Sequence, residues 1–254
     1  MPQAMERLLA TPMIRPRLPA IKPSAMSLPS LIVYRFWHGA RRAASSGLAE
    51  AWAGDYGPAM MFKPDDILRM LILRMGEAAV ITEASRMAAF LNEPRKRFHK
   101  KALAVVVPES IEAVQAVANF CNVLGIGLIP QGGNTGLVGA QVPLYGSEII
   151  VSLTKLNKVR HIDAAAGVMT AEAGLTLQEA HQAAEAAGAI FPLWIGSQGS
   201  ARIGGVLSSN AGGVQVLAYG NARELCLGIE AVLADGRLYR GLNALKKDNT
   251  GYDL

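Results

Sequence analysis

The chain has 254 residues, of which 51% are hydrophobic and 18% charged, and its formal net charge is +5. At about 150 residues per domain this length suits one large or two small globular units, and the low charge content argues against disorder of the whole chain. No uncharged apolar stretch reaches the roughly 18 residues of a membrane-spanning helix, so the sequence predicts no transmembrane segment.

The positive charge belongs to the N-terminal segment. Residues 1–49 carry seven basic side chains and one acidic side chain, so the rest of the chain is close to neutral. Nucleic-acid binding usually needs a basic patch on the folded domain. We therefore expect no nucleic-acid partner.

Residues 1–64 differ from the rest of the chain. Six prolines between residues 2 and 29 prevent a continuous helix, so the sequence predicts a poorly ordered basic extension. The acid-poor, Arg- and Ser-containing composition is typical of an organellar transit peptide, although the prolines argue against one. An over-extended reading frame that starts near Met60 or Met61 explains the segment equally well.

The organised domain is expected from about residue 65. Pro64-Asp65-Asp66 is a typical helix start. The sequence then predicts a strand over 102–107, a helix from Ser110 to Gly125, a strand over 126–129 ending at Pro130 and a strand over 148–153. Together these elements indicate a compact α/β lobe.

The second half of the chain follows a different pattern. We expect a strand over 168–173, a helix from Thr176 to Gly188, a strand over 228–233 and a hairpin turn at 234–236. Residues 125–213 hold 16 of the 26 glycines. Because this density costs backbone entropy, it indicates that the backbone comes close to another group.

Two glycine-rich loops carry the chemistry. The first, over 130–136, follows a strand, and its successive glycines favour a backbone nest for phosphate oxygens. It is neither a P-loop nor the GxGxxG fingerprint, and alone it is as consistent with a structural turn. The second, over 196–213, offers small residues with hydroxyl and amide groups, which suits a flat heterocycle. Together the loops favour a bound dinucleotide.

These loops, with the motifs at 219–223 and 247–254, resemble the D-2-hydroxyacid dehydrogenase branch of the vanillyl-alcohol oxidase (PCMH-type) flavoproteins. That family includes D-2-hydroxyglutarate dehydrogenase, D-lactate dehydrogenase and the flavin subunit of glycolate oxidase. The resemblance implies an α+β fold: a two-lobed PCMH-type FAD-binding domain over 65–254, truncated before the substrate-cap domain. The small lobe would cover about 100–158 and the incomplete larger lobe about 159–254.

The resemblance also implies a set of FAD-binding positions. The FAD diphosphate would lie on Gly132, Gly133, Asn134, Thr135 and Gly136. The diphosphate and ribityl chain would run along Gly196, Ser197, Gly199, Ser200, Gly204 and Gly205 toward the isoalloxazine. The ring pocket would be closed by Ser209, Asn210, Gly212 and Gly213, and the adenine edge would meet the Ile229 backbone.

Two departures from the family pattern affect these expectations. Asn134 occupies the place of the histidine that bonds the flavin in covalent members, so we expect noncovalent FAD. In the second loop, Ala201 and Arg202 stand where relatives more often have Cys and an uncharged residue.

The resemblance implies oxidation of a small D-2-hydroxy acid to the 2-oxo acid by hydride transfer to flavin N5, with a quinone, flavoprotein or cytochrome as electron acceptor. The family's metal and substrate motifs lie beyond the last motif matched here, so no catalytic residue and no metal site is assigned. None of the four histidines is a good substitute. Cys121 and Cys226 have apolar neighbours and no CxxC spacing, which favours buried thiols.

Two alternatives stay open. The chain could be a truncated or split-gene product that binds FAD without catalysis and needs a C-terminal partner chain. A cell-wall sugar-nucleotide reductase on the same fold fits the 247–252 motif less well. The resemblance implies a cytoplasmic protein, either free or peripheral at the inner membrane, or a mitochondrial one if the basic N-terminus is a transit peptide.

Overall fold

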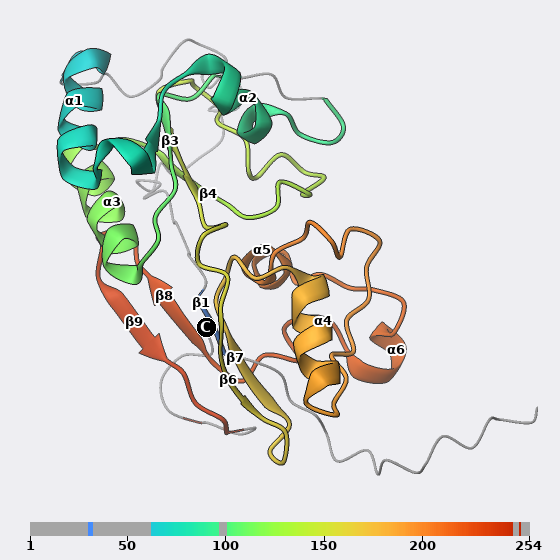
Figure 1. Cartoon of the computed structure of the whole chain (residues 1–254). Helices are drawn as coiled ribbons and strands as arrows, with labels where there is room; N and C mark the ends of the chain where they lie inside the picture. The colour runs from blue at the N-terminus through green and yellow to red at the C-terminus, as the bar shows by residue number, and fades with distance from the viewer. Residues whose placement is uncertain (1–29, 33–61, 97–100, 246–248, 250–254) are drawn as a thin grey trace, which may run out of the picture.

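The computed structural model describes residues 30–32, 62–96, 101–245 and 249. Within these ranges the chain forms two β-sheets with helices packed on them, which confirms the predicted α+β class (Figure 1). The four-stranded sheet has the order β2-β3-β5-β4, with β2 (Val80–Ile81), β3 (Ala104–Val106), β4 (Leu128–Gln131) and β5 (Ile149–Ser152). The five-stranded sheet has the order β6-β7-β1-β8-β9, with β1 (Ser30–Ile32), β6 (Val159–Asp163), β7 (Val168–Ala171), β8 (Ile229–Val232) and β9 (Leu238–Gly241).

The four-stranded sheet is covered on both faces. Strands β3, β5 and β4 are parallel, and β2 pairs antiparallel with β3. Because side chains alternate along a strand, Ala104 and Val106 pack in the core with α1 (Pro64–Met75) and α3 (Ile111–Leu124), whereas Val105 packs with Met87 of α2 (Ala84–Leu91). A short 3-10 turn, η2 (Glu77–Ala79), joins α1 to β2.

Helix α3 forms where the sequence predicts it. The Ser110 hydroxyl accepts a hydrogen bond from the Ala113 N–H at 3.2 Å, and the helix ends at Gly125, whose φ of +65° is left-handed. Cys121 is buried on its inner face, and this burial raises the pKa of the thiol to about 12. The prediction of a buried thiol is confirmed for Cys121, while Cys226 is half-buried and its thiol donates to the Gly228 carbonyl at 3.6 Å.

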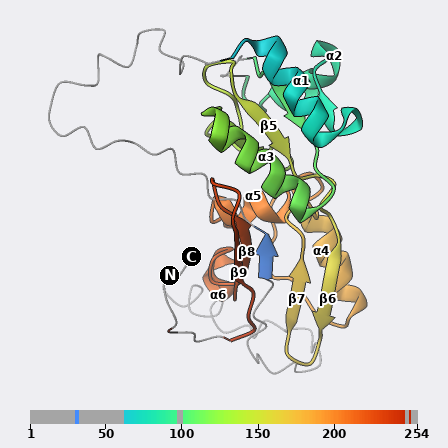
Figure 2. The same cartoon turned by 90° about the vertical axis from the view of Figure 1, so that its left-hand side faces the viewer.

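Strand β1 lies in the middle of the five-stranded sheet. It pairs in parallel with β7 on one side and β8 on the other (Figure 2). These three residues fall in the segment predicted as a poorly ordered extension, and that assignment of 1–64 stays a prediction. In the five-stranded sheet β7 and β8 do not pair with each other, and β1 between them satisfies both ladders. The rest of 1–61 lies outside the described residues.

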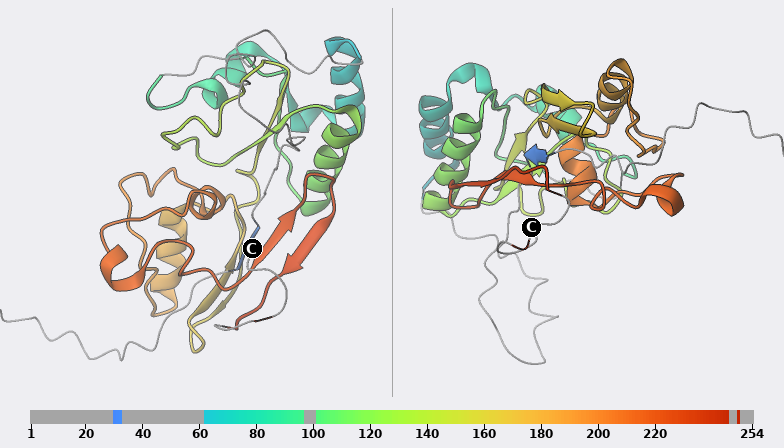
Figure 3. Two further views of the ribbon diagram at one scale, coloured as in Figure 1. Left: turned by 180° about the vertical axis from the view of Figure 1, so that it is seen from behind. Right: turned by 90° about the horizontal axis from the view of Figure 1, so that it is seen from below.

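Helices α4 (Leu177–Ala186) and α5 (Ile203–Ser208) pack against the five-stranded sheet, and the β8–β9 hairpin reaches α3. The short helix α6 (Val216–Tyr219) has no buried residue. The hairpin turn lies against α3, where the Gln115 side-chain amide donates to the Gly236 carbonyl at 2.9 Å (Figure 3). Gly236 has a φ of +86°, which favours glycine at this turn. The two sheets are thereby joined through α3.

A charged bridge spans the five-stranded sheet. Arg160 of β6 contacts the Glu172 carboxylate at 3.3 Å and the Glu230 carboxylate of β8 at 3.0 Å. Both carboxylates are largely buried, whereas Arg240 adds a longer contact of 3.8 Å to Glu230. Arg160 therefore neutralises two buried acids that come from opposite sides of β1.

Some elements differ from the sequence prediction. Strand β4 continues through Pro130 to Gln131, because β4 is an edge strand and an edge tolerates proline. Strand β6 and helices α2, α5 and α6 were not predicted, and α1, β2 and α2 extend the first lobe before residue 100. No helix in the described ranges is both long enough and apolar enough to cross a membrane.

Candidate functional site

The first glycine-rich loop follows β4 and is fixed at both ends. Gln131, buried at the end of β4, donates from its amide to the Gln141 carbonyl at 3.1 Å, and Gln141 donates to the Gly136 carbonyl at 2.7 Å. Asn134 has a φ of +53° and donates to the Asn92 carbonyl, just after α2, at 2.6 Å. The loop is therefore held in one conformation by side-chain amides.

The second glycine-rich loop runs beside the connection from β7 to α4. The Leu177 N–H donates to the Ala201 carbonyl at 2.9 Å, and the Ile203 N–H donates to the Leu175 carbonyl at 2.9 Å. An isolated antiparallel bridge lies between these bonds. Residues 196–205 are thus paired along one edge. The exposed residues of this stretch are Gly196, Ser197, Gly199, Ser200 and Gly205.

The two loops cross in direct contact. A Cβ atom on Gly133 would lie 1.7 Å from the Ser200 carbonyl oxygen, and one on Gly132 would lie 3.0 Å from Cβ of Arg202. Only glycine allows this approach, because real Cβ atoms do not come so close to a carbonyl. The structure therefore brings together the two loops that the sequence predicts to form one site.

The predicted site glycines divide into two groups. Gly204 and Gly213 are required by packing within the chain, since their Cβ atoms would lie 2.9 Å from Cβ of Ala173 and 1.9 Å from the Trp194 carbonyl oxygen. Gly196 and Gly205 have no atom within 4 Å of such a Cβ and no left-handed φ. No contact with the described residues explains glycine at these two positions, so their side without a Cβ is open toward a bound group.

The polar residues after the second loop are bonded within the chain. The Ser209 hydroxyl donates to the Gly205 carbonyl at 2.8 Å, and the Asn210 side-chain oxygen accepts from the Arg223 N–H at 3.0 Å. Gly212 faces the Asn221 side chain. Their role at the flavin ring stays a prediction. Thr135 is half-buried in the first loop, and its role at the diphosphate also stays a prediction.

Ile229 lies in the five-stranded sheet rather than in either loop. It begins β8, where it pairs with Leu31 and Gly241, and it packs against the core that α4 and α5 cover. A contact between its backbone and adenine stays a prediction.

The loops carry unpaired buried polar atoms. Among the described residues, four buried side-chain atoms lack a hydrogen-bond partner: Asn134 Oδ1, Gln198 Oε1, Arg202 Nε and Gln215 Oε1. Three lie in the two loops and the fourth lies two residues beyond the second. Unsatisfied buried groups are rare and costly, so their concentration here fits a ligand with several polar atoms. The residues present therefore fit FAD.

Titratable groups near the loops have structural roles. The Thr176 side chain and N–H both bond to Glu179 in a capping box, and these bonds lower the pKa of that carboxyl. His181 is stacked on Trp194 and contacts the Leu193 carbonyl at 2.9 Å, while burial lowers its pKa. No cluster of metal-ligating side chains occurs within the described ranges.

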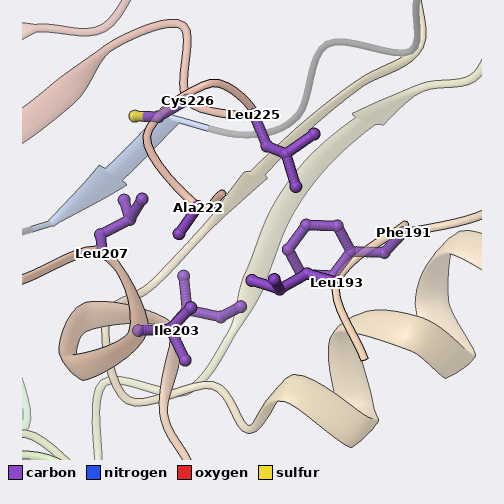
Figure 4. Close-up of a pocket in the computed structure, with 8 residues that line it drawn as sticks. Phe191, Leu193, Ile203, Leu207, Ala222, Leu225 and Cys226 are labelled. Atoms are coloured by element: carbon purple, nitrogen blue, oxygen red, sulfur yellow. The ribbon is translucent and has the colours of Figure 1, made fainter. Parts of the chain in front are cut away.

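A small apolar cavity lies inside the second lobe and is not the cofactor site. Its lining includes Phe191, Leu193, Ile203 and Leu225 (Figure 4). Its volume of about 10 Å³ is the size of a single water, whereas ligand pockets hold roughly 300–1,000 Å³.

Sequence reasoning missed the groups that support the loops. The Gly174 carbonyl, 28 residues before Arg202, accepts a 2.6 Å hydrogen bond from the Arg202 guanidinium. A Cβ on Gly174 would lie 1.9 Å from the Leu153 carbonyl oxygen. Gln131 could have been noticed, because a polar residue that ends a buried strand just before glycines is a typical loop anchor.

Comparisons with known proteins agree with this geometry. Residues 102–241 match the family described as FAD binding domain. D-2-hydroxyglutarate–pyruvate transhydrogenase of Saccharomyces cerevisiae is 40% identical over 168 residues, which cover 66% of this chain and 34% of that protein. Mitochondrial D-2-hydroxyglutarate dehydrogenase of Danio rerio is 45% identical over 147 residues, covering 58% of this chain and 27% of that protein. The chain thus spans between about a quarter and a third of the length of these relatives.

Solved structures show the same fold at low sequence identity. p-Cresol methylhydroxylase with bound substrate aligns with a TM-score of 0.62 and 21% identity, over 75% of this chain and 39% of that chain. Alkyldihydroxyacetonephosphate synthase aligns with a TM-score of 0.56 and 19% identity, over 65% and 32%. This confirms the PCMH-type fold over part of those chains. The protein belongs to the FAD-binding domain family and is homologous to the FAD-dependent D-2-hydroxyglutarate and D-lactate dehydrogenases.

Proposed function

We propose that this chain is the FAD-binding part of a flavin-dependent oxidoreductase that oxidises a small D-2-hydroxy acid to the 2-oxo acid. The crossing of the two glycine-rich loops carries the proposal, because the loop that we propose for the diphosphate lies beside backbone that is open at Gly196 and Gly205. The relatives named for D-2-hydroxyglutarate and D-lactate support the substrate class.

The chain's residues have distinct roles in this proposal. Gly132 to Gly136 would hold the diphosphate, and the open side of Gly196 and Gly205 would face the rest of the cofactor. Bound FAD supplies a hydride acceptor. We propose noncovalent binding, because Asn134 has no nucleophilic side chain and its amide already donates to the Asn92 carbonyl.

The substrate-binding groups are proposed to lie outside this chain. Oxidation of a hydroxy acid needs a base for the hydroxyl proton and cations for the carboxylate. Among the described histidines, His161 lies on β6 and His181 is stacked on Trp194. The remaining two thirds of the relatives' length, as a C-terminal partner segment, would bring these groups, and a quinone, flavoprotein or cytochrome would accept the electrons.

Anaerobic flavin reduction tests the proposal. The FAD-loaded chain is mixed with D-2-hydroxyglutarate, D-lactate or glycolate, alone and with the C-terminal two thirds of a D-2-hydroxyglutarate dehydrogenase, and the visible flavin band is followed. We expect bleaching by a D-acid in the mixture and none by the L-enantiomer. Flavin retained by the chain but reduced by NADPH and by no hydroxy acid would contradict the proposed substrate class.

A further inference from the structure

A single charged side chain occurs in the two glycine-rich loops. Residues 130–139 and 196–213 contain no Asp, Glu, Lys or Arg other than Arg202. This residue lies at the crossing, where a Cβ on Gly132 would lie 3.0 Å from its Cβ and 3.3 Å from its Cγ. The aliphatic part of the Arg202 side chain therefore lies against the loop that would hold the diphosphate.

The Arg202 guanidinium is incompletely satisfied by the chain. One terminal nitrogen donates to the Gly174 carbonyl at 2.6 Å, and Nε is buried without a partner. Among the described residues, no carboxylate oxygen lies within 4.0 Å of an Arg202 side-chain nitrogen, the limit for an ion pair. Glu179 is near, but its carboxylate is already bonded to the Thr176 N–H and hydroxyl at 2.8 and 2.6 Å.

A half-buried cation that makes no direct ion pair is unfavourable, and the attraction of Glu179 for Arg202 leaves the buried Nε without a partner. We propose that Arg202 is the counterion of the FAD diphosphate and positions the cofactor at the loop crossing. Arginine suits this role because its planar guanidinium pairs with phosphate oxygens through several N–H groups. The inference rests on the proposed FAD site and adds a charge contact that neither glycine loop supplies by its backbone alone.

Flavin titrations of the full 254-residue chain test the inference. Wild type, Arg202→Gln and Arg202→Lys are titrated with FAD and with riboflavin, which lacks phosphate, at low and high KCl. Thermal unfolding without flavin is the control for the Gly174 contact. We expect Arg202→Gln to weaken FAD binding by about tenfold or more, to leave riboflavin binding within about twofold, and to flatten the salt dependence. Arg202→Lys should keep the salt dependence.

The contrary outcomes are distinct. Equal loss of FAD and riboflavin affinity, or unchanged FAD affinity in Arg202→Gln, would overturn the inference and leave Arg202 as a tether for Gly174. If Arg202→Gln does not fold, Arg202→Lys decides, and salt-independent FAD binding by that variant overturns the inference. A wild-type chain that binds neither flavin contradicts the proposed function itself.

Discussion

Substituting alanine at Gly133 tests the loop crossing directly. The added Cβ would lie 1.7 Å from the Ser200 carbonyl oxygen and 2.6 Å from its carbon. Non-bonded atoms normally stand about 3.5 Å apart, so the loops would have to separate by about 1.8 Å. Forced overpacking costs up to about 3 kcal/mol, which corresponds to a fall in Tm of about 6–12 °C for a domain of this size.

Gly205→Ala is the matched control. The same methyl group meets no atom within 4 Å, and Gly205 lies inside α5, where alanine is favoured over glycine by about 1 kcal/mol. We expect the flavin-free Tm to rise or stay constant while FAD affinity falls, because the methyl group would occupy space proposed for the cofactor. Thermal scans without flavin and FAD titrations separate the two effects. A Gly133→Ala protein that unfolds at the wild-type temperature would refute the crossing.

Three further substitutions test the fold. Arg160→Met leaves the buried Glu172 and Glu230 without their shared cation, and urea unfolding should show a free energy of unfolding lower by about 3 kcal/mol. A smaller loss than that of the exposed Arg237→Met control would contradict the bridge. Leu31→Pro removes a backbone N–H between β7 and β8, and the Tm should fall; an unchanged Tm would mean that β1 adds no stability. Burial depresses the pKa of His181 in the folded state, so the unfolded chain binds more protons and the stability should decline as pH falls below about 6.5. The stability of His181→Gln should decline less over the same range. Parallel pH profiles of stability for the two proteins would disprove the effect.

Local signals explain which elements the sequence predicted. Ser110 and Gly125 mark both ends of α3 through contacts within a few residues, and the structure has the same helix. Helix α5 was not predicted because Gly204 and Gly205 are poor helix formers, and its start depends on a bond from the Gly204 N–H to the Ala173 carbonyl. Strand β1 depends on two partners more than 130 residues away, so no local pattern indicates it.

The candidate site was predicted in part. Both glycine-rich loops were recognised from composition, since glycine density is a local property. Their crossing was not, because Gly133 and Ser200 are 67 residues apart and meet only through the pairing of β4 with its sheet and of the second loop with residues 173–178. The glycine pattern also could not separate Gly213, which packing requires, from Gly205, which stays open.

The most direct test of the proposed FAD site is the visible absorption spectrum of the purified chain after incubation with FAD and gel filtration, followed by denaturation. We expect a flavin spectrum with equimolar FAD, all of it released on denaturation because Asn134 forms no bond to the flavin. A colourless protein with a cooperative unfolding transition would contradict the claim that the two crossing loops form an FAD site, and flavin that stays with the denatured chain would contradict noncovalent binding.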